Sequence, residues 1–262
     1  MVPVEWPFEN MVGVIDLLGG KAVHAIAGQR AKYKPVSFCD GDAGKLLQYY
    51  HRLGIQSFYI ADLDSIGGGQ LQAGLLQELG SHVDGDLLVD PGWSGSESDE
   101  VLEVIGELAD DHSGCGVIAA TETLGSPLML NRLVERLAAE KVWLGLDFRA
   151  GELRVSPQFA DQVMIGRAGS YANVNSDAAV DHHAWVTHAT QLGINGLVIL
   201  DIAAVGQSGG PVTGELCRQI RDANPGVLLW SGGGIRDAAD ARRLMRQGCD
   251  GCLVATALHH RK

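Results

Sequence analysis

The sequence predicts an α/β fold, the (β/α)₈ or TIM barrel, which occupies residues 1–262 as a single domain. The chain length of 262 residues is typical of barrels of this class. Short apolar runs alternate with amphipathic stretches over the whole chain, and this alternation is typical of a parallel sheet covered by helices. An internal repeat divides the chain into two half-barrels.

Eight runs of continuous hydrophobicity are expected to form strands that are covered on both sides. They are residues 11–15, 56–61, 87–89, 115–119, 142–146, 196–200, 227–230 and 251–254. Apolar residues at helical spacing follow four of these runs, in residues 43–53, 97–108, 128–137 and 238–247. Long segments, residues 17–39 and 148–175, follow the first and fifth strands, and such lengths are typical of lids or binding loops.

The repeat consists of three short segments that recur in the same order. Ile-Asp-Leu at residues 15–17 matches Leu-Asp-Phe at 146–148, and Ala-Asp-Leu at 61–63 matches Leu-Asp-Ile at 200–202. Residues 116–121 match residues 251–256 at a similar spacing. Two halves of four strands each favour a closed eight-stranded barrel over an open sheet.

Composition narrows the choice of partners. The formal net charge of −12 and the absence of a basic patch argue against nucleic acid as a partner. No apolar run approaches the roughly 18 residues of a membrane span, and no secretory signal precedes the first strand. Five cysteines, an odd number, indicate a reducing compartment, so we expect a cytoplasmic protein with a small phosphorylated substrate. Both a monomer and a homo-oligomer remain open.

Carboxylates at the carboxyl ends of strands are the candidate catalytic groups, because the active site of a closed parallel barrel lies at those ends. Asp16 ends the first strand and Asp147 the fifth, on opposite walls, so that one can accept a proton while the other donates one. Alternatively, each caps a strand end or holds a loop. Asp62 and Asp201 end the second and sixth strands, where they either bind substrate hydroxyls or hold loops.

A phosphate site is predicted in the loops after the seventh and eighth strands. Gly232, Gly233 and Gly234 allow successive N–H groups to face an anion, and a helix that begins near Arg236 would add its positive end. Further donors are Ala255 and the Thr256 hydroxyl. The alternative is an ordinary glycine-rich turn.

The repeat also predicts a phosphate site after the third and fourth strands, but that site is altered or lost. Pro91 has no N–H to donate, and Glu122 brings a negative charge.

Histidines and the remaining motifs suggest little further chemistry. His24 lies in a basic segment that either closes over an anionic substrate or is a solvated loop. The pairs His182-His183 and His259-His260 are expected on the surface. The acids lack histidines at metal-ligand spacing, and no dinucleotide-binding glycine motif follows the first strand, so neither a metal nor a cofactor is expected.

Several segments together resemble the HisA/HisF enzymes of histidine biosynthesis. They are Val-Ile-Asp-Leu-Leu-Gly-Gly-Lys-Ala-Val-His at residues 14–24, Gly-Leu-Asp at 145–147, Asp-Ile at 201–202 and Ser-Gly-Gly-Gly-Ile at 231–235. The resemblance implies an Amadori rearrangement of a phosphorylated aminoaldose to an aminoketose. It makes Asp16 the general base and Asp147 the general acid, and it requires no cofactor.

The sequence also departs from that family. His24 stands where the family has arginine, Leu200 where it has threonine, and Val205 where it has an acid. The chain looks closer to a HisA-related group, some members of which are associated with tetrahydromethanopterin or methanofuran C1 pathways. A lyase or condensing enzyme acting on a singly phosphorylated metabolite is therefore an alternative function, and a non-catalytic barrel is another.

Overall fold

The computed structural model describes residues 5–96, 99–110, 114–160 and 181–259. Eight parallel strands close into a barrel, because the last strand pairs with the first through Met11 opposite Cys252 and Gly13 opposite Val254. The predicted barrel is thereby confirmed. Its strands, in chain order, are β1 (Met11–Leu18), β4 (Ser57–Asp62), β5 (Leu87–Asp90), β6 (Cys115–Ala120), β7 (Val142–Arg149), β9 (Gly196–Asp201), β10 (Leu228–Gly232) and β11 (Gly251–Val254).

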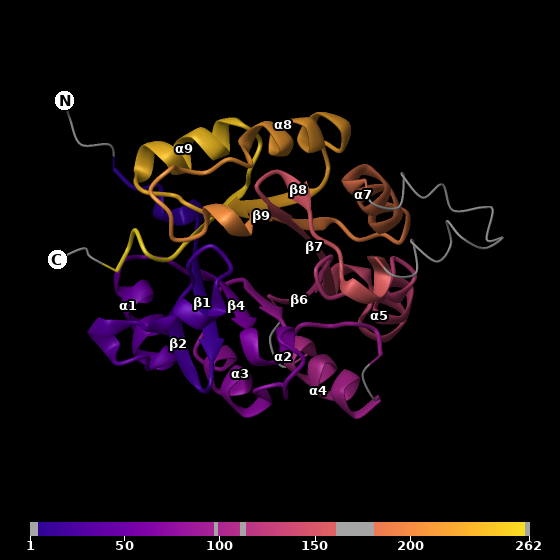
Figure 1. Cartoon of the computed structure of the whole chain (residues 1–262), viewed down its shortest axis with the longest axis horizontal. Coiled ribbons are helices and arrows are strands. Elements are labelled where there is room, and N and C mark those ends of the chain that lie inside the picture. Colours follow the sequence, from indigo (N-terminus) through magenta and orange to yellow (C-terminus); the bar gives the residue numbers. More distant parts are fainter. Residues whose placement is uncertain (1–4, 97–98, 111–113, 161–180, 260–262) are drawn as a thin grey trace.

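Helices surround the strands (Figure 1). They are α1 (Ala43–Arg52), α2 (Leu63–Ile66), α3 (Ala73–Gly80), α4 (Asp99–Asp110), α5 (Met129–Leu137), α7 (His182–Gln191), α8 (Gly214–Ala223) and α9 (Ala238–Arg246). Short 3₁₀ turns are η1 (Phe8–Asn10), η2 (Arg30–Lys32), η3 (Ser37–Cys39), η4 (Ala139–Lys141) and η6 (Ile202–Ala204). The four predicted helical stretches correspond to α1, α4, α5 and α9. In the part of the chain that the structure describes, no helix has the length and hydropathy of a membrane span.

Two apolar layers hold the barrel together. One cluster joins the outward-facing strand residues to the helices, and the other takes inward-facing residues from all eight strands. Trp143 and Trp230 fill the interior, with ring centroids 4.9 Å apart. A Cβ at Gly196 would overlap the indole of Trp143, so only glycine fits there. Because side chains alternate along a strand, the inward-facing row of β1 continues from Val12 to Asp16.

The long segments after the first and fifth strands are partly regular. β1 continues into an antiparallel hairpin with β2 (Lys21–His24), which pairs with β3 (Lys34–Pro35), and β7 forms a hairpin with β8 (Glu152–Leu153). Both hairpin turns have positive φ at their two central residues, 58° and 76° at Gly19 and Gly20, and 53° and 83° at Ala150 and Gly151. The two halves thus share a hairpin at the barrel mouth. Residues 161–175 of the second segment lie outside the described residues.

Candidate active site

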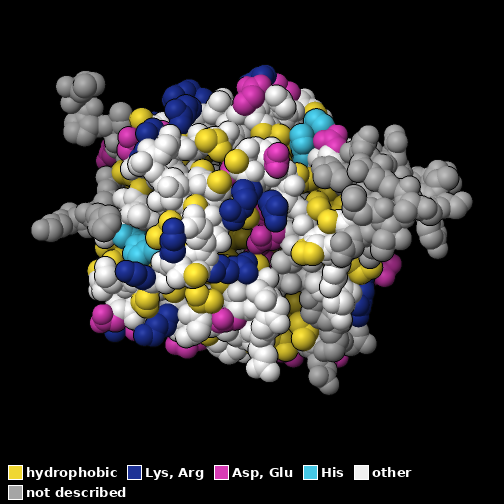
Figure 2. Space-filling view, viewed as in Figure 1, with side chains coloured by type: hydrophobic (Ala, Val, Ile, Leu, Met, Phe, Trp, Pro, Cys, Tyr) yellow, Lys and Arg dark blue, Asp and Glu magenta, His cyan; other side chains and the backbone are white. Residues whose placement is uncertain are grey.

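A cavity of about 630 Å³ opens at the carboxyl ends of the barrel strands, and both Asp16 and Asp147 line it. β1 and β7 stand four strands apart in either direction around the barrel, so the two carboxylates lie on opposite walls. Figure 2 shows a central hollow with acidic and apolar atoms inside and basic side chains around it. The basic residues of the lining are Arg30, Arg149 and Arg236. The predicted juxtaposition of Asp16 and Asp147 at one cavity is therefore present.

Asp16 is poised to change its charge near neutral pH. Burial raises the pKa of its carboxyl to about 7, the neighbouring Asp90 raises it as well, and the Arg30 guanidinium opposes the shift. A carboxylate with this pKa is a stronger base than an exposed one and is substantially ionised at pH 7. These properties suit a general base.

Asp147 is also held in its protonated form. Burial, with Glu122 and Asp90 nearby, raises the pKa of its carboxyl well above the ordinary value, and only a hydrogen bond from the Glu122 backbone opposes the shift. Its Oδ2 atom is fully buried and has no hydrogen-bond partner within the described parts of the chain. The Asp147 N–H donates to Thr121 Oγ1 at 3.1 Å, which fixes the backbone at this point. A buried protonated carboxyl next to a cavity suits a general acid.

Asp90 and Tyr59 join these acids, although the sequence did not single them out as site residues. Asp90 Oδ1 accepts the Gly92 N–H at 3.0 Å, and its Oδ2 accepts the Tyr59 hydroxyl at 3.0 Å. Burial raises the pKa of Asp90 to about 7, and Glu122 adds to the rise, while the Gly92 and Tyr59 hydrogen bonds oppose it. The sequence signal that could have identified Asp90 as a site residue is its position at the carboxyl end of β5, the third barrel strand.

Glu122 and Arg30 complete this wall. The Arg30 Nη2 atom lies 3.8 Å from Glu122 Oε1, and both side chains line the cavity. Arg30 comes from η2 in the basic segment after the first strand. The basic segment therefore reaches the cavity, which is consistent with the alternative that it closes over a substrate.

The predicted phosphate loop is only partly as expected. Gly233 and Gly234 line the cavity with φ of 86° and 80°, and Ala255 and Thr256 line it beside them. Gly232 does not line the cavity: it ends β10, where a Cβ would contact Leu253 at 2.6 Å. The loop and strand-end residues thus gather at one wall, as the phosphate prediction requires.

The helix after this loop contributes less than the sequence suggested. α9 begins at Ala238 rather than near Arg236, and the Asp237 side chain accepts the N–H groups of Ala239 and Asp240, each at 2.9 Å. The Asp237 N-cap thus takes two of the N–H donors of this helix end, and the prediction that the helix end faces a phosphate stays a prediction.

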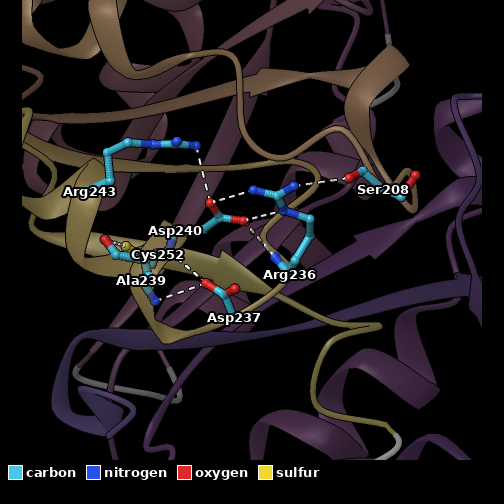
Figure 3. A network of polar contacts seen from close by, with 8 residues as sticks. Ser208, Arg236, Asp237, Ala239, Asp240, Arg243 and Cys252 are labelled. Atoms are coloured by element: carbon cyan, nitrogen blue, oxygen red, sulfur yellow. Dashed lines mark hydrogen bonds and ion pairs between the residues drawn. The ribbon is translucent and has the colours of Figure 1, made fainter. Parts of the chain in front are cut away.

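Arg236 is held by its own neighbours (Figure 3). Its Nε lies 2.7 Å and its Nη2 3.0 Å from the Asp240 carboxylate oxygens, and its Nη1 donates to the Ser208 carbonyl at 3.2 Å. Arg243 also contacts Asp240, at 3.2 Å. The guanidinium charge is thereby paired, and the contact with Ser208 ties the loop after β10 to the segment after β9.

Asp62 and Asp201 are buried, but neither lines the cavity. Asp201 accepts the N–H groups of Ala150 and Gly151, at 3.1 and 2.8 Å, and so holds the β7–β8 turn.

Asp62 acts on the β1–β2 turn through two intermediaries. It accepts hydrogen bonds from the Asp64 N–H at 3.1 Å and the Gln72 N–H at 2.6 Å, and those side chains accept the N–H groups of Gly19 and Gly20. The structure thus favours the loop-holding alternative for both Asp62 and Asp201.

His24 lines the cavity as part of a hydrogen-bonded chain. Its Nδ1 lies 3.3 Å from Nδ1 of His259, whose Nε2 lies 2.7 Å from the Tyr50 hydroxyl, and that hydroxyl donates to the Val14 carbonyl at 3.2 Å. With the Tyr50 proton used in this way, His259 donates through Nε2, and its neutral form accepts at Nδ1 from His24. The expectation of a surface histidine was wrong for His259, which is buried against α1 and lines the cavity.

Metal-ligating atoms come together at one place among the described residues. Those of Asp181, His182 and His183 lie within 4.8 Å of one another at the start of α7, and none of these residues lines the cavity.

A closed barrel with an acid–base pair at its mouth and a glycine loop on the adjoining wall defines an α/β-barrel protein with a small-molecule site. The chain belongs to the histidine biosynthesis protein family, whose profile matches residues 10–262.

Individual relatives cover nearly the whole chain. An uncharacterised protein of Methanocaldococcus jannaschii is 29% identical over 95% of this chain and 93% of its own. Two proteins named 1-(5-phosphoribosyl)-5-((5-phosphoribosylamino)methylideneamino)imidazole-4-carboxamide isomerase are also similar. That of Stenotrophomonas maltophilia is 27% identical over 93% of this chain and 91% of its own. That of Parabacteroides distasonis is 21% identical over 97% and 95%.

Proposed function

We propose that the protein is an isomerase that converts a phosphorylated aminoaldose into the corresponding aminoketose. The observation that carries this proposal is that Asp16 and Asp147 line one cavity from opposite sides, with the pKa of each carboxyl raised by burial. The similarity to proteins named as imidazole-carboxamide isomerases supports the reaction class. Five buried free thiols fit a reducing compartment such as the cytoplasm.

The two aspartates supply the proton transfers of such a rearrangement. Asp147 donates its proton to the sugar ring oxygen as the bond from that oxygen to C1 breaks, and the nitrogen lone pair forms the C1–N double bond. Asp16 then removes the proton from C2, and the electrons of that C–H bond form an enolamine. Protonation at C1 and loss of the hydroxyl proton at C2 give the ketone. The net reaction is redox-neutral within the substrate, so it requires no external oxidant.

The glycine wall would anchor the substrate phosphate. Gly233, Gly234, Ala255 and Thr256 surround one end of the cavity, where loops after the last two strands of such barrels commonly bind phosphate. His24, which contacts His259 and lines the cavity, is a candidate for an additional donor.

An isomerase assay with matched variants tests this proposal. The purified protein is incubated with the bisphosphorylated imidazole-carboxamide aminoaldose and with singly phosphorylated aminoaldoses, and ketose formation is measured. We expect turnover of at least one substrate, and loss of it in Asp16→Asn and Asp147→Asn. Asp181→Asn, whose side chain lies outside the cavity lining, is the control. A fully active Asp16→Asn/Asp147→Asn double variant would overturn the proposal.

The altered loop after β5 favours a second candidate, a lyase or condensing enzyme that acts on a singly phosphorylated metabolite. Here the same aspartates would move protons while a carbon–carbon or carbon–nitrogen bond forms or breaks. Product masses distinguish the two candidates, because an isomerase leaves the substrate mass unchanged. If instead both aspartates tolerate replacement with no change in any cellular activity, the non-catalytic alternative is favoured.

A further inference from the structure

The two sides of the cavity carry different charges. Four described carboxylates line the cavity: Asp16, Asp90, Glu122 and Asp147. They lie on one half of the barrel mouth, the acidic wall, which runs from β1 through β4, β5 and β6 to β7 and has Asp16 and Asp147 at its two ends. On the remaining wall, formed by described residues from Leu200 onward, no carboxylate lines the cavity. A substrate that spans the cavity therefore meets acids at one end and the glycine loop at the other.

Two positions in the loop after β5 offer no free N–H to a second phosphate. Its Gly92 N–H already binds Asp90, and Pro91 has no N–H. The loop also packs tightly, since the Ser65 hydroxyl donates to the Pro91 carbonyl at 2.6 Å and a Cβ at Gly92 would lie 2.6 Å from the Ile66 nitrogen. The Asp90 carboxylate thus occupies the donor that an anion would use.

Guanidinium groups are fewer than carboxylates on this acidic wall, where Arg30 and Arg149 line the cavity beside the four acids. Arg30 lies 3.8 Å from Glu122, and the Asp147 Oδ2 atom, fully buried, has no partner within the described parts of the chain. A buried charge or polar atom is costly unless it is paired. An ammonium or amidinium group of the ligand would donate charge-assisted hydrogen bonds to these oxygens, whereas a neutral hydroxyl would donate a single weaker one.

We propose that the substrate carries one phosphate, bound by the glycine wall, and at its opposite end a positively charged nitrogen group, bound by Glu122 and Asp90 beside the protonated Asp147. This inference rests on the proposed function for the position of the phosphate and specifies the other end of the same substrate. It replaces the doubly phosphorylated compound in the names of the isomerase relatives with a zwitterionic substrate.

Three probes of equal length test the charge of the second end. Aminobutyl phosphate, hydroxybutyl phosphate and butanediol bisphosphate share a phosphate and differ only in the opposite group. Isothermal titration calorimetry of the full chain measures their affinities, with inorganic phosphate as the reference. We expect aminobutyl phosphate to bind about tenfold more tightly than hydroxybutyl phosphate, and butanediol bisphosphate to bind most weakly.

Two matched charge changes locate the effect. Glu122→Gln should reduce the preference for the amine to about threefold or less, while the affinity for inorganic phosphate stays the same and shows that the variant is folded. Glu152→Gln removes an equal charge from the exposed β8 strand, outside the cavity lining, and should leave the preference unchanged.

The inference is overturned if the bisphosphate binds as tightly as the amine, if amine and hydroxyl bind equally, or if Glu122→Gln has no effect. Its failure can be distinguished from failure of the isomerase proposal. Turnover of the bisphosphorylated imidazole-carboxamide compound would support the reaction and overturn this inference. A preference for the amine without any aldose–ketose conversion would support this inference and overturn the isomerase proposal.

Discussion

The loops after β5 and β10 occupy equivalent places in the two half-barrels, but they differ in what their backbone can bind. Both turn through glycines of positive φ, 67° at Gly92 and 86° at Gly233. In the first loop the Asp90 carboxylate accepts the glycine N–H, whereas Gly233 lines the cavity with no lining acid beside it. Repeated halves can therefore share backbone curvature while single side chains decide which end of a cavity accepts an anion.

The largest expected effect tests whether the acidic wall performs the chemistry. Asp147→Asn should lower kcat by about 10²–10⁴-fold, because a general acid typically contributes that much, with little change in KM. Steady-state kinetics on the identified substrate measures both constants. The control is a thermal melt, which should show no loss of stability, since asparagine replaces a buried carboxyl of raised pKa. An unchanged kcat would place the chemistry elsewhere.

Repeat-related threonines offer a sharper contrast between the halves. Thr256 lines the cavity, while Thr121 is buried and accepts the Asp147 N–H. Thr256→Val should raise KM about tenfold and leave the melting temperature unchanged. Thr121→Val should instead lower kcat and destabilise the fold by about 1–3 kcal/mol, because a buried N–H loses its acceptor. If both variants affected only KM, the two halves would not differ as described.

The pH dependence of kcat/KM should show which aspartate is the base. Asp16, with a pKa of about 7, must lose its proton to act, so the rate should rise as the pH increases through 7. Burial also raises the pKa of Asp147 well above its ordinary value, so loss of its proton should produce a falling limb at a higher pH than an exposed aspartate would give. Arg30→Gln removes the charge that lowers the Asp16 pKa and should move the rising limb to higher pH. A rise centred near pH 4 would contradict this assignment.

The smallest effect concerns the stability of the loop after β5. Asp90 has a pKa of about 7 in the folded protein and 3.8 as its ordinary value, so the unfolded chain loses this proton first. The contribution of Asp90 to stability is thus lost as the pH rises from about 4 to 7. The melting temperature of Asp90→Asn minus that of the unaltered protein should therefore be larger at pH 8 than at pH 4. Each kcal/mol of this stability difference corresponds to about 2–4 °C. An equal difference at both pH values would contradict the raised pKa.

Much of the barrel could be predicted from local sequence, because covered parallel strands leave continuous apolar runs and strand-end acids point to the mouth. Asp16 and Asp147 were identified in this way. The roles of Asp62 and Asp201 could not be decided, since the answer depends on hairpin N–H groups that tertiary structure brings to them. Residues 17–39 were expected to form a loop, but Gly19 and Gly20 form the turn of a hairpin between β1 and β2. The paired glycines are a sequence signal for such a turn.

His259 shows a different limit of sequence reasoning. A histidine close to the last residue of the sequence is typical of a surface position, yet Tyr50, 209 residues earlier, bonds to its ring. Asp90 directly precedes Pro91 in the sequence, but its bond to Tyr59 depends on the register between neighbouring strands. In both cases the missing information was a pairing between distant segments.

The pairing of β1 with β11 has a consequence for how the protein emerges from the ribosome. The first strand is synthesised early, but its second edge has no partner until about residue 254 has left the exit tunnel. Until then the nascent chain exposes unpaired strand edges, which are sites for unwanted association. The wall of the cavity beside Asp16 is therefore incomplete until β11 pairs with β1.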